Sequence, residues 1–323
     1  MIIEKVQMGD KMLPMFKWSG GKRRELEHVQ KLAPTQFANY CEPFVGGGAA
    51  WFRLAHKRNH IGDTNADVIN FYNVVKQHGK AFIDDLNSMS TFYTDTMADL
   101  KVVMDATTKH GSWESIRDPL LWFPAAQPRE MCAKKWRKQK RDEYSPLTEF
   151  YYNWRDGKHT TDYDIAKRFY VLRNLAFGGM LRYNSEGKFN VPYGYYKNFK
   201  KLAWNSDYER LFSNSTFECQ PWKLTVSKMT TNDFVFLDPP YTREFTKYSA
   251  DGDFGEQDHR ELAKWFSSKS AKAMIILNKD DFTESLYSNF IKNEYEFSYG
   301  VRYREDRLNK DDVTTYHFVA TNY

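Results

Sequence analysis

Residues 40–77, YCEPFVGGGAAWFRLAHKRNHIGDTNADVINFYNVVKQ, decide the fold. The segment from Tyr40 to Val45 indicates the end of a strand, which is followed by a glycine turn and the start of a helix. A second short strand ends near Asp63, after which apolar residues recur at helical spacing, at Val68, Phe71, Val74 and Val75. This order of strand, turn and helix, used twice, predicts a parallel sheet.

Strand patterns return near the C-terminus. Phe234–Leu237 is an apolar run that ends at a double proline, and Ala273–Asn278 is a second candidate for a buried strand. EYEFSYGVRYR (294–304) and TTYHFVATNY (314–323) alternate in a way that favours an antiparallel hairpin. Residues 79–204, which lie between the two groups of strand patterns, have helical patterns and few strand candidates. We therefore predict one α/β domain from residues 1–78 and 205–323, with a mainly helical domain, residues 79–204, inserted in it.

Composition narrows the class of protein. The chain has 323 residues, of which 41% are hydrophobic and 17% aromatic, so it can bury a substantial core. No apolar run is long enough to span a bilayer, and the first residues lack a secretory pattern. Three distant cysteines, Cys41, Cys132 and Cys219, predict neither a disulfide framework nor a metal site. A reducing cytoplasm is the expected location.

The charge is distributed unevenly. The net charge is +5 overall, and it divides into +4 for residues 1–78, +6 for residues 79–204 and −5 for residues 205–323. Basic residues over the first two-thirds of a chain are typical of a protein that binds a polyanion. On charge alone, an ordinary uneven surface explains the asymmetry equally well.

Residues 16–24, FKWSGGKRR, suggest a phosphate-binding loop. The P-loop pattern G-x-x-x-x-G-K-[ST] needs a glycine where this chain has Phe16, and a hydroxyl where it has Arg23. Both requirements fail, so we do not expect nucleotide triphosphate hydrolysis.

The glycine turn and the strand after it favour a nucleoside-containing cofactor. Glycines at a strand-to-helix turn let the backbone approach a ligand closely, and Asp63 follows Gly46 by 17 residues. A carboxylate at about this distance commonly binds ribose hydroxyls.

The tetrapeptide Asp238-Pro239-Pro240-Tyr241 carries the most specific signal. In an open α/β sheet it would lie at the carboxyl ends of the strands, beside the glycine turn. The prolines remove two amide donors and leave the Pro239 carbonyl to accept hydrogen bonds. With the carboxylate of Asp238 and the ring of Tyr241, this group suits a planar base that bears an amine.

Five blocks in this order, FKWSGGK, EPFVGGG, GDTNADVINFYNVVK, LRYNSEGKFNVPYG and FLDPPY, resemble the alpha group of DNA adenine methyltransferases, the Dam-type enzymes. The resemblance covers both ends of the chain and the last part of the insert. It implies a Rossmann-like class I methyltransferase sheet, mostly parallel with an antiparallel closing hairpin. It also implies that the insert is a helical DNA-recognition domain.

The resemblance assigns roles to individual residues. Trp18 and Lys22 would contact S-adenosylmethionine, Asp63 would bind its ribose, and Phe44–Gly48, including Gly46, would lie on the methionine side. Asp238 would lie between the cofactor and the target base, and Lys17 would reach toward the DNA. Double-stranded DNA is then the partner of a cytoplasmic monomer in a prokaryotic or phage-infected cell, with no metal and no membrane contact.

The expected reaction is direct attack by the adenine amine on the methyl group. Hydrogen bonds to Asp238 and the Pro239 carbonyl would aim the nitrogen lone pair, and Tyr241 would stack on a flipped base. Attack at cytosine carbon-5 is disfavoured, because the cysteines do not follow proline. Amino-cytosine methylation ranks second, since its enzymes usually carry Ser at the position of Asp238. A catalytically silent DNA-binding homologue, and methylation of RNA or a protein amide, are further alternatives.

Cations and aromatics alternate within Leu172–Lys201, a composition that favours nucleic-acid contact over an aromatic core with a basic edge. They are Arg173, Arg182, Lys188, Lys197, Lys200 and Lys201, with Phe177, Tyr183, Phe189, Tyr193, Tyr195, Tyr196 and Phe199. By analogy with the family, Arg182 would read a base edge, Phe177 would wedge into the space left by the flipped base, and Asn190 would also contact DNA.

Two features depart from the family pattern. Enzymes of this type that methylate GATC typically carry an aromatic-Asn-Gly sequence where this chain has Phe177-Gly178-Gly179, and their Asn-Arg pair is reversed here as Arg173-Asn174. A strict GATC preference is therefore not predicted, although Lys17 and Arg182 are compatible with it. Residues 100–150 match no family block, and their basic segment 129–141 is either a solvated helix face or a DNA-backbone contact.

Overall fold

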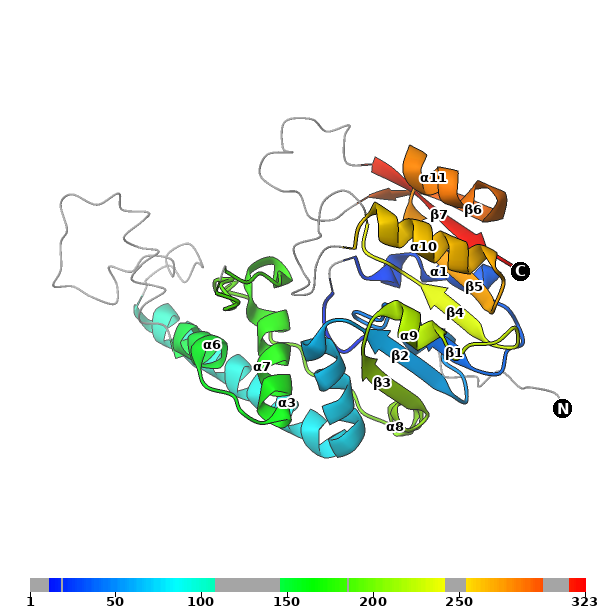
Figure 1. The fold of residues 1–323 in the computed structure, drawn as a ribbon. Helices are drawn as coiled ribbons and strands as arrows, with labels where there is room; N and C mark the ends of the chain where they lie inside the picture. The colour runs from blue at the N-terminus through cyan, green and yellow to red at the C-terminus, as the bar shows by residue number, and fades with distance from the viewer. Residues whose placement is uncertain (1–11, 19, 108–145, 185, 242–253, 299–313) are drawn as a thin grey trace. The chain divides into compact units, whose positions relative to one another are not determined.

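The computed structural model describes residues 12–18, 20–107, 146–184, 186–241, 254–298 and 314–323 (Figure 1). The chain divides into two compact units. Unit 1 comprises Met1–Gln77 and Trp204–Tyr323, and unit 2 comprises His78–Ala203. The basic segment 129–141 lies outside the described residues. None of the described helices combines the length and the apolar character that crossing a membrane requires.

Unit 1 is built on a mixed sheet in the strand order β3-β2-β1-β4-β5-β7-β6. Its strands are β1 (Tyr40–Glu42), β2 (Asn59–Asp63), β3 (Ser215–Cys219), β4 (Phe234–Leu237), β5 (Lys272–Asn278), β6 (Ile291–Ser298) and β7 (Thr314–Thr321). Strands β1 to β5 are parallel, and β7 runs antiparallel to both β5 and β6. The predicted α/β class and the closing hairpin are therefore confirmed.

The helices of unit 1 precede β1 or lie between these strands in the chain. They are η1 (Lys22–Arg24), α1 (Leu26–Leu32), α2 (Trp51–Leu54), the first part of α3 (Ala66–Thr107), α8 (Ser206–Ser213), α9 (Trp222–Val226), α10 (Glu256–Ser267), α11 (Asp281–Tyr287) and η4 (Ser288–Phe290). The helix α3 is interrupted at Gly79, whose φ of 51° and ψ of −126° are not helical.

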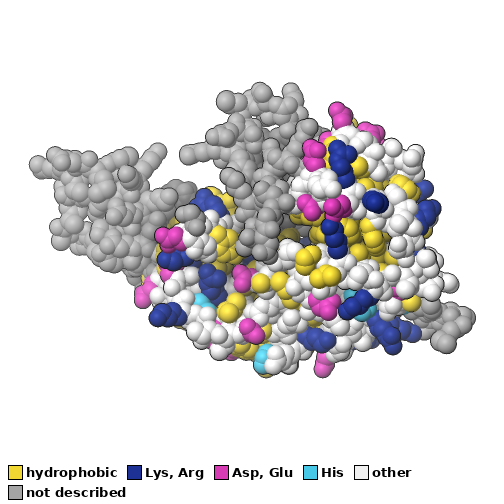
Figure 2. Space-filling view, viewed as in Figure 1, with side chains coloured by type: hydrophobic (Ala, Val, Ile, Leu, Met, Phe, Trp, Pro, Cys, Tyr) yellow, Lys and Arg dark blue, Asp and Glu magenta, His cyan; other side chains and the backbone are white. Residues whose placement is uncertain are grey.

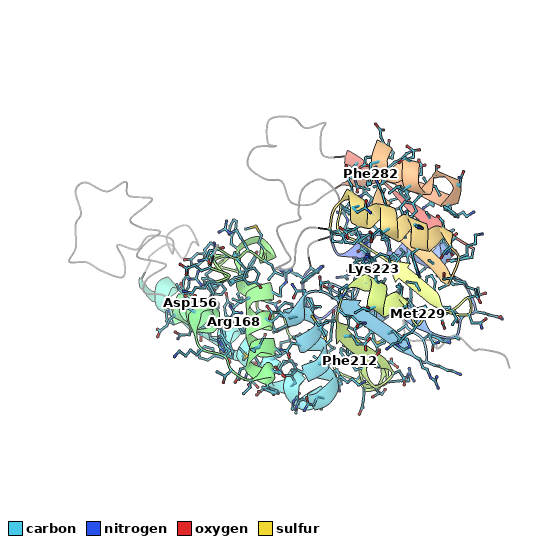
Figure 3. All side chains as sticks on the ribbon, in the orientation of Figure 1. Asp156, Arg168, Phe212, Lys223, Met229 and Phe282 are labelled. Atoms are coloured by element: carbon cyan, nitrogen blue, oxygen red, sulfur yellow. The ribbon has the colours of Figure 1, made fainter. Side chains whose placement is uncertain are left out.

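The central strands are buried on both faces, which explains their unbroken apolar runs. All four residues of β4 are buried. Val235 and Leu237 belong to a core cluster with Trp222 of α9 and Phe266 of α10, helices that lie in front of the strands in Figure 1. Met229, labelled in Figure 3, belongs to the same cluster.

Strand β3 was absent from the sequence prediction. Its five residues, STFEC, are mostly polar or small, and it lies at the edge of the sheet beside β2. Only Ser215 and Phe217 of its residues are buried. An edge strand with one half-buried face gives a weak pattern, and this one is held in place by its ladder with β2 and by ring packing of Phe217 against Phe212, which Figure 3 labels.

The described helices of unit 2 are the rest of α3, α6 (Pro146–Asp156), α7 (Asp162–Leu175) and η3 (Phe177–Gly179), and its described residues after Gly179 form no helix. The N-cap of α7 is Thr161, whose hydroxyl accepts a hydrogen bond from the Asp164 amide. Arg168, labelled in Figure 3, donates from α7 to the carbonyl of Arg155 at the end of α6.

Several residues of the expected nucleic-acid surface are buried in unit 2. Arg173 is 1% exposed, and Phe189, Tyr193 and Phe199 are between 3% and 5% exposed. Tyr193 stacks on Tyr151, and Phe199 stacks on Tyr170. These four side chains therefore build the core of unit 2, and placing them on a DNA-facing surface is wrong. On the face shown in Figure 2, cationic and anionic side chains are interspersed over the described residues.

Candidate active site

The strand order places two loops of the sheet side by side. From β1 the chain moves outward to β2 and β3, whereas β4 pairs with β1 on its other side and leads on to β5. Ligands of open α/β sheets bind outside the carboxyl ends of the strands, where the strand order reverses. The residues after β1 and β4 are the glycine turn and Asp238, so the topology brings these two predicted elements to the same edge.

The glycine turn is packed against Trp18. A Cβ atom on Gly46 would lie 2.3 Å from Trp18 Nε1, and one on Gly47 would lie 2.8 Å from Trp18 Cβ. Gly46 also has a φ of +44°, a conformation that side chains rarely adopt. A Cβ on Gly48 would approach both Trp51 and the Tyr72 hydroxyl at 3.0 Å. The glycines therefore give the turn its shape and make room for the Trp18 indole beside it.

Asp63 lies at the end of β2 and closes the turn. Its Oδ2 accepts a hydrogen bond of 2.8 Å from the Gly46 amide, and its Oδ1 accepts one of 2.9 Å from the Asn65 amide. Burial raises the pKa of Asp63, and these amide hydrogen bonds oppose the rise. A carboxylate can accept about four hydrogen bonds, so this group retains capacity for a ribose hydroxyl.

Lys22 and Asp238 form a close ion pair. Lys22 Nζ lies 2.8 Å from Asp238 Oδ1 and donates to the Gly20 carbonyl at 2.9 Å. The lysine is only 3% exposed, whereas the Asp238 side chain keeps 21% of its surface exposed. Burial raises the pKa of Asp238 to about 6, and the neighbouring Lys22 charge and hydrogen bond oppose that rise. The carboxylate is therefore ionised above about pH 6.

A second carboxylate lies behind this pair. Glu25, 2% exposed, has its Oε1 4.0 Å from Lys22 Nζ. Its Oε2 accepts hydrogen bonds of 2.6 Å from the Tyr295 hydroxyl and 2.6 Å from His317 Nδ1. Burial raises the pKa of Glu25, but the His317 hydrogen bond, the Lys22 charge and the Tyr295 hydroxyl outweigh it and leave the pKa below its ordinary value.

A histidine of α10 holds the segment 238–241 after β4, which we call the tip. His259 is fully buried, and its Nε2 lies 3.0 Å from the Pro240 carbonyl oxygen. Burial lowers the pKa of His259, which favours the neutral ring with a proton on Nε2 as the donor. Phe254 packs edge-on against His259 and against Phe44, and Phe282, labelled in Figure 3, also meets the imidazole edge-on.

Tyr241 and Pro239 complete the tip. Pro239 is buried, whereas Pro240 is exposed and Tyr241 is half-buried. The Lys22 ammonium lies 4.9 Å from the centre of the Tyr241 ring. His317 meets the same ring edge-on, with 5.6 Å between ring centroids. Unit 1 thus brings together Trp18, Lys22, the glycine turn, Asp63, Asp238 and Tyr241, and Lys17 is exposed one residue before Trp18.

The remaining predicted residues belong to unit 2. Phe177 is 58% exposed, and Gly178 after it has a φ of +65°. Arg182 Nε donates to Asn190 Oδ1 at 2.8 Å, and the Asn190 amide donates to the Arg182 carbonyl at 3.0 Å. Two of the residues predicted to bind DNA therefore hold each other in place on an exposed loop. Asn174 is 5% exposed and donates to the Tyr170 carbonyl, so the Arg173-Asn174 pair is internal.

A family model of the D12 class of N6 adenine-specific DNA methyltransferases matches residues 18–299. The chain belongs to this class. It is 28% identical over 316 residues to a type II methyltransferase, M.CviBI, of Paramecium bursaria Chlorella virus NC1A, covering 97% of this chain and all of the relative. It is 30% identical to the type II methyltransferase M.MjaIII of Methanocaldococcus jannaschii, covering 86% of this chain and 88% of the relative. A DNA adenine methylase of Haemophilus influenzae is 27% identical, covering 85% and 82%.

The family membership confirms the resemblance seen in the sequence and identifies the chain as an adenine-specific DNA methyltransferase. The seven-stranded sheet agrees with the class I methyltransferase fold. Among the described residues, no group of three or more His, Cys, Asp or Glu side chains could hold a metal ion.

Sequence reasoning missed four side chains around the methyltransferase site: Glu25, His259, Tyr295 and His317. Glu25 directly follows the segment FKWSGGKRR and lies three residues after Lys22, but nothing in the sequence distinguishes a buried glutamate there from the exposed Glu27. Tyr295 and His317 lie directly opposite each other on β6 and β7, more than 260 positions from Glu25. Only the fold brings them together. His259 is a lone histidine in an amphipathic helical pattern, which gives no signal of its contact.

Proposed function

We propose that this protein transfers a methyl group from S-adenosylmethionine to the N6 amine of an adenine flipped out of duplex DNA. The observation that carries this proposal is the position of Asp238. Its carboxylate follows the β4 strand at the point where the strand order reverses, paired with Lys22 and next to the glycine turn. Membership of an N6 adenine-specific family supplies the acceptor atom.

The residues of unit 1 fit S-adenosylmethionine. Asp63 offers a carboxylate for ribose hydroxyls at the end of β2, and Gly46 and Gly48 keep the adjacent turn free of side chains. Trp18 lies against the same turn and offers an aromatic face. In this assignment Phe44 to Gly48 contact the methionine side, Lys22 contacts the cofactor, and Asp238 lies between the cofactor and the base. The bound cofactor supplies a methyl group already activated by a sulfonium.

The chain's own groups then position the acceptor. An aromatic amine is a weak nucleophile, because its lone pair is delocalised into the ring. The Asp238 carboxylate accepts a hydrogen bond from the amine, and Lys22 contacts Oδ1, so Oδ2 is the oxygen assigned to it. The Pro239 carbonyl accepts the second bond and the Tyr241 ring stacks on the base. Both bonds hold the lone pair along the line of transfer, where orientation supplies much of the rate acceleration.

In this proposal, unit 2, His78–Ala203, is the target-recognition domain. Phe177 is exposed and aromatic, as a residue that wedges into a base stack must be. The guanidinium of Arg182, fixed by Asn190, presents a fork that can bind the edge of a guanine in the major groove. Lys17 would contact DNA from unit 1. Enzymes that methylate GATC typically carry Asn at the position of Gly178, which has no side chain to contact DNA. We therefore do not assign GATC as the recognition sequence of this protein.

The proposal is tested by incubating the protein with methyl-labelled S-adenosylmethionine and unmethylated duplex DNA, then digesting the DNA to nucleosides. We expect N6-methyladenine, and its loss in Asp238→Ala with binding of duplex DNA retained. Recovery of N4-methylcytosine would favour amino-cytosine methylation, and transfer that survives Asp238→Ala would refute the catalytic assignment. DNA binding without any transfer would indicate a silent homologue. Parallel incubations with RNA and with protein cover those acceptors.

A further inference from the structure

The buried cluster behind the ion pair contains more ionisable groups than the proposed chemistry uses. Lys22, Glu25 and His317 are each 3% exposed or less, and all three lie within one chain of contacts that ends at Asp238. Burying charged groups costs folding free energy unless each is paired and hydrogen-bonded. Apolar side chains would fill the same space at a lower cost, so this cluster requires an explanation.

The segment that carries Lys22 has little rigidity of its own. Lys22 follows Gly20 and Gly21 and begins a 3-10 helix of only three residues. Gly20 has a φ of +71°, and within the described part of the chain, its two neighbours aside, no atom lies within 4 Å of the Cβ position at that residue. A lysine side chain has four rotatable bonds, so the backbone alone does not fix where its ammonium lies. Neighbouring side chains must restrain it.

The β6–β7 hairpin supplies those restraints through Glu25. Tyr295 of β6 and His317 of β7 both bond to Glu25 Oε2, which leaves Oε1 toward Lys22 at 4.0 Å. Both residues are themselves held by ring stacking. Tyr295 stacks on His28 with 3.8 Å between ring centroids, and His317 stacks on Phe297 at 4.5 Å. Glu25 is therefore a fixed anion that faces the same ammonium as Asp238.

We propose that Glu25 and His317 are positioning residues for the methyl transfer: Glu25, held by His317 and Tyr295, keeps the Lys22 ammonium on the Asp238 carboxylate. This inference rests on the proposed function and deepens it. It gives the C-terminal hairpin a role in the reaction, although the hairpin carries none of the five blocks that resemble the family. Lys22 then keeps Asp238 in one orientation, with one oxygen available for the amine.

The electrostatics of Asp238 agree with this arrangement. Burial raises its pKa, the Lys22 charge lowers it, the Glu25 charge raises it and the His317 charge lowers it. Tyr295 and Glu42 of β1 also lie near the Asp238 carboxylate. Burial raises the pKa of each of these two groups above its ordinary value. Loss of Glu25 and loss of His317 must therefore shift the titration of Asp238 in opposite directions. If the cluster only stabilised the fold, these substitutions would lower the melting temperature and leave kcat unchanged.

The variants can be matched closely. Glu25→Gln keeps the shape and removes the charge, and Tyr295→Phe keeps the ring on His28 but removes one donor. His317→Asn keeps a donor near the position of Nδ1, whereas His317→Phe keeps a ring on Phe297 and removes the donor. Glu27→Gln is the control, because Glu27 lies two residues from Glu25 but is exposed and pairs with Lys31.

For each variant we would measure kcat, KM for DNA, thermal unfolding and the carboxyl ¹³C titration of Asp238 in cofactor-free protein, assigned with Asp238→Asn. We expect kcat to fall about tenfold or more in Glu25→Gln and His317→Phe, since small misplacements of reacting groups cost up to about a hundredfold. KM for DNA should stay within about twofold. His317→Asn should retain more of kcat than His317→Phe.

The ¹³C titration gives a readout that does not depend on turnover. Asp238 should titrate at a lower pH in Glu25→Gln and at a higher pH in His317→Phe. Unchanged kcat with a lowered melting temperature, or the same Asp238 titration in all variants, would overturn the inference. If Glu25→Gln does not fold, Tyr295→Phe carries the test through the rate, because it removes one of the two donors that hold Glu25: kcat should fall while KM for DNA stays within about twofold, and an unchanged kcat would overturn the inference. A wild-type protein that makes no N6-methyladenine would refute the proposed function, whereas failure confined to the variants would refute only the positioning role.

Discussion

Removing the Lys22 charge is the sharpest test of the site. Lys22 Nζ lies 2.8 Å from Asp238 Oδ1, in a place where the lysine is 3% exposed, so water screens the pair poorly. An opposite charge at such a distance lowers a carboxyl pKa by about 1–3 units. The pKa of Asp238 is raised to about 6 even with that help. In Lys22→Met we expect it to rise to about 7–9.

The sign of the effect on the rate follows from the role of the carboxylate as an acceptor. Asp238 must be ionised to accept the amine hydrogen bond, so kcat/KM should fall as pH decreases through its pKa. For the wild type this fall is expected near pH 6. For Lys22→Met it should move upward by about 1–3 pH units. At pH 7 such a shift corresponds to a loss of about twofold for one unit and about ninetyfold for three units, and the rate is recovered on the alkaline side.

The assay is a profile of kcat/KM for duplex DNA from pH 5 to 9.5, at saturating S-adenosylmethionine. Lys31→Met is the matched control, since Lys31 is on the neighbouring helix α1 and pairs with Glu27 on the surface. Its profile should coincide with that of the wild type. A loss of rate in Lys22→Met that is the same at every pH would refute the electrostatic reasoning and leave Lys22 a role in cofactor binding only.

Three further predictions address the surrounding structure. His259→Leu removes the donor to the Pro240 carbonyl and should lower kcat about tenfold, because the tip loses its anchor, whereas His259→Gln should recover part of it in the same assay. Gly46→Ala should destabilise the protein by about 1–3 kcal/mol because of the φ of +44° alone. The added methyl group should also displace Trp18 and change the tryptophan fluorescence. An unchanged midpoint of urea unfolding would contradict the expected destabilisation. Phe177→Ala should fold normally, because the side chain is 58% exposed, and should reduce the fluorescence increase of 2-aminopurine placed at the target adenine; full flipping would exclude a wedge role.

The hairpin and the N-terminal loop show why the site depends on long-range contacts. Asp238 is positioned by β4, whose neighbours in the sheet are β1 and β5. Its immediate partner Lys22 comes from a loop near the N-terminus, and the groups behind Lys22 come from β6 and β7. Substitutions in any of these segments therefore act on the same carboxylate, and their effects on the rate should be strongly non-additive.

The sequence by itself determined the elements whose pattern is local. The strand-glycine-helix order of residues 40–77, the buried run Phe234–Leu237 and the alternation of the last ten residues predicted the sheet, because hydrophobic periodicity and glycine turns act over a few residues. Together with the Asp-Pro-Pro-Tyr motif, they also identified the family and the carboxylate at its centre. These inferences needed no knowledge of which segments lie next to each other.

Only the tertiary structure decided which side chains surround that carboxylate. Tyr295 and His317 bind Glu25 across more than 260 positions of the chain, and no local sequence pattern predicts such contacts. It also decided that Arg173 and three aromatic rings of Leu172–Lys201 are buried, where composition alone had indicated an exposed surface. The physical reason is the same in both cases. Burial and pairing of a side chain depend on everything packed around it, which the order of the strands sets in unit 1 and the packing of the helices and the loop after them sets in unit 2.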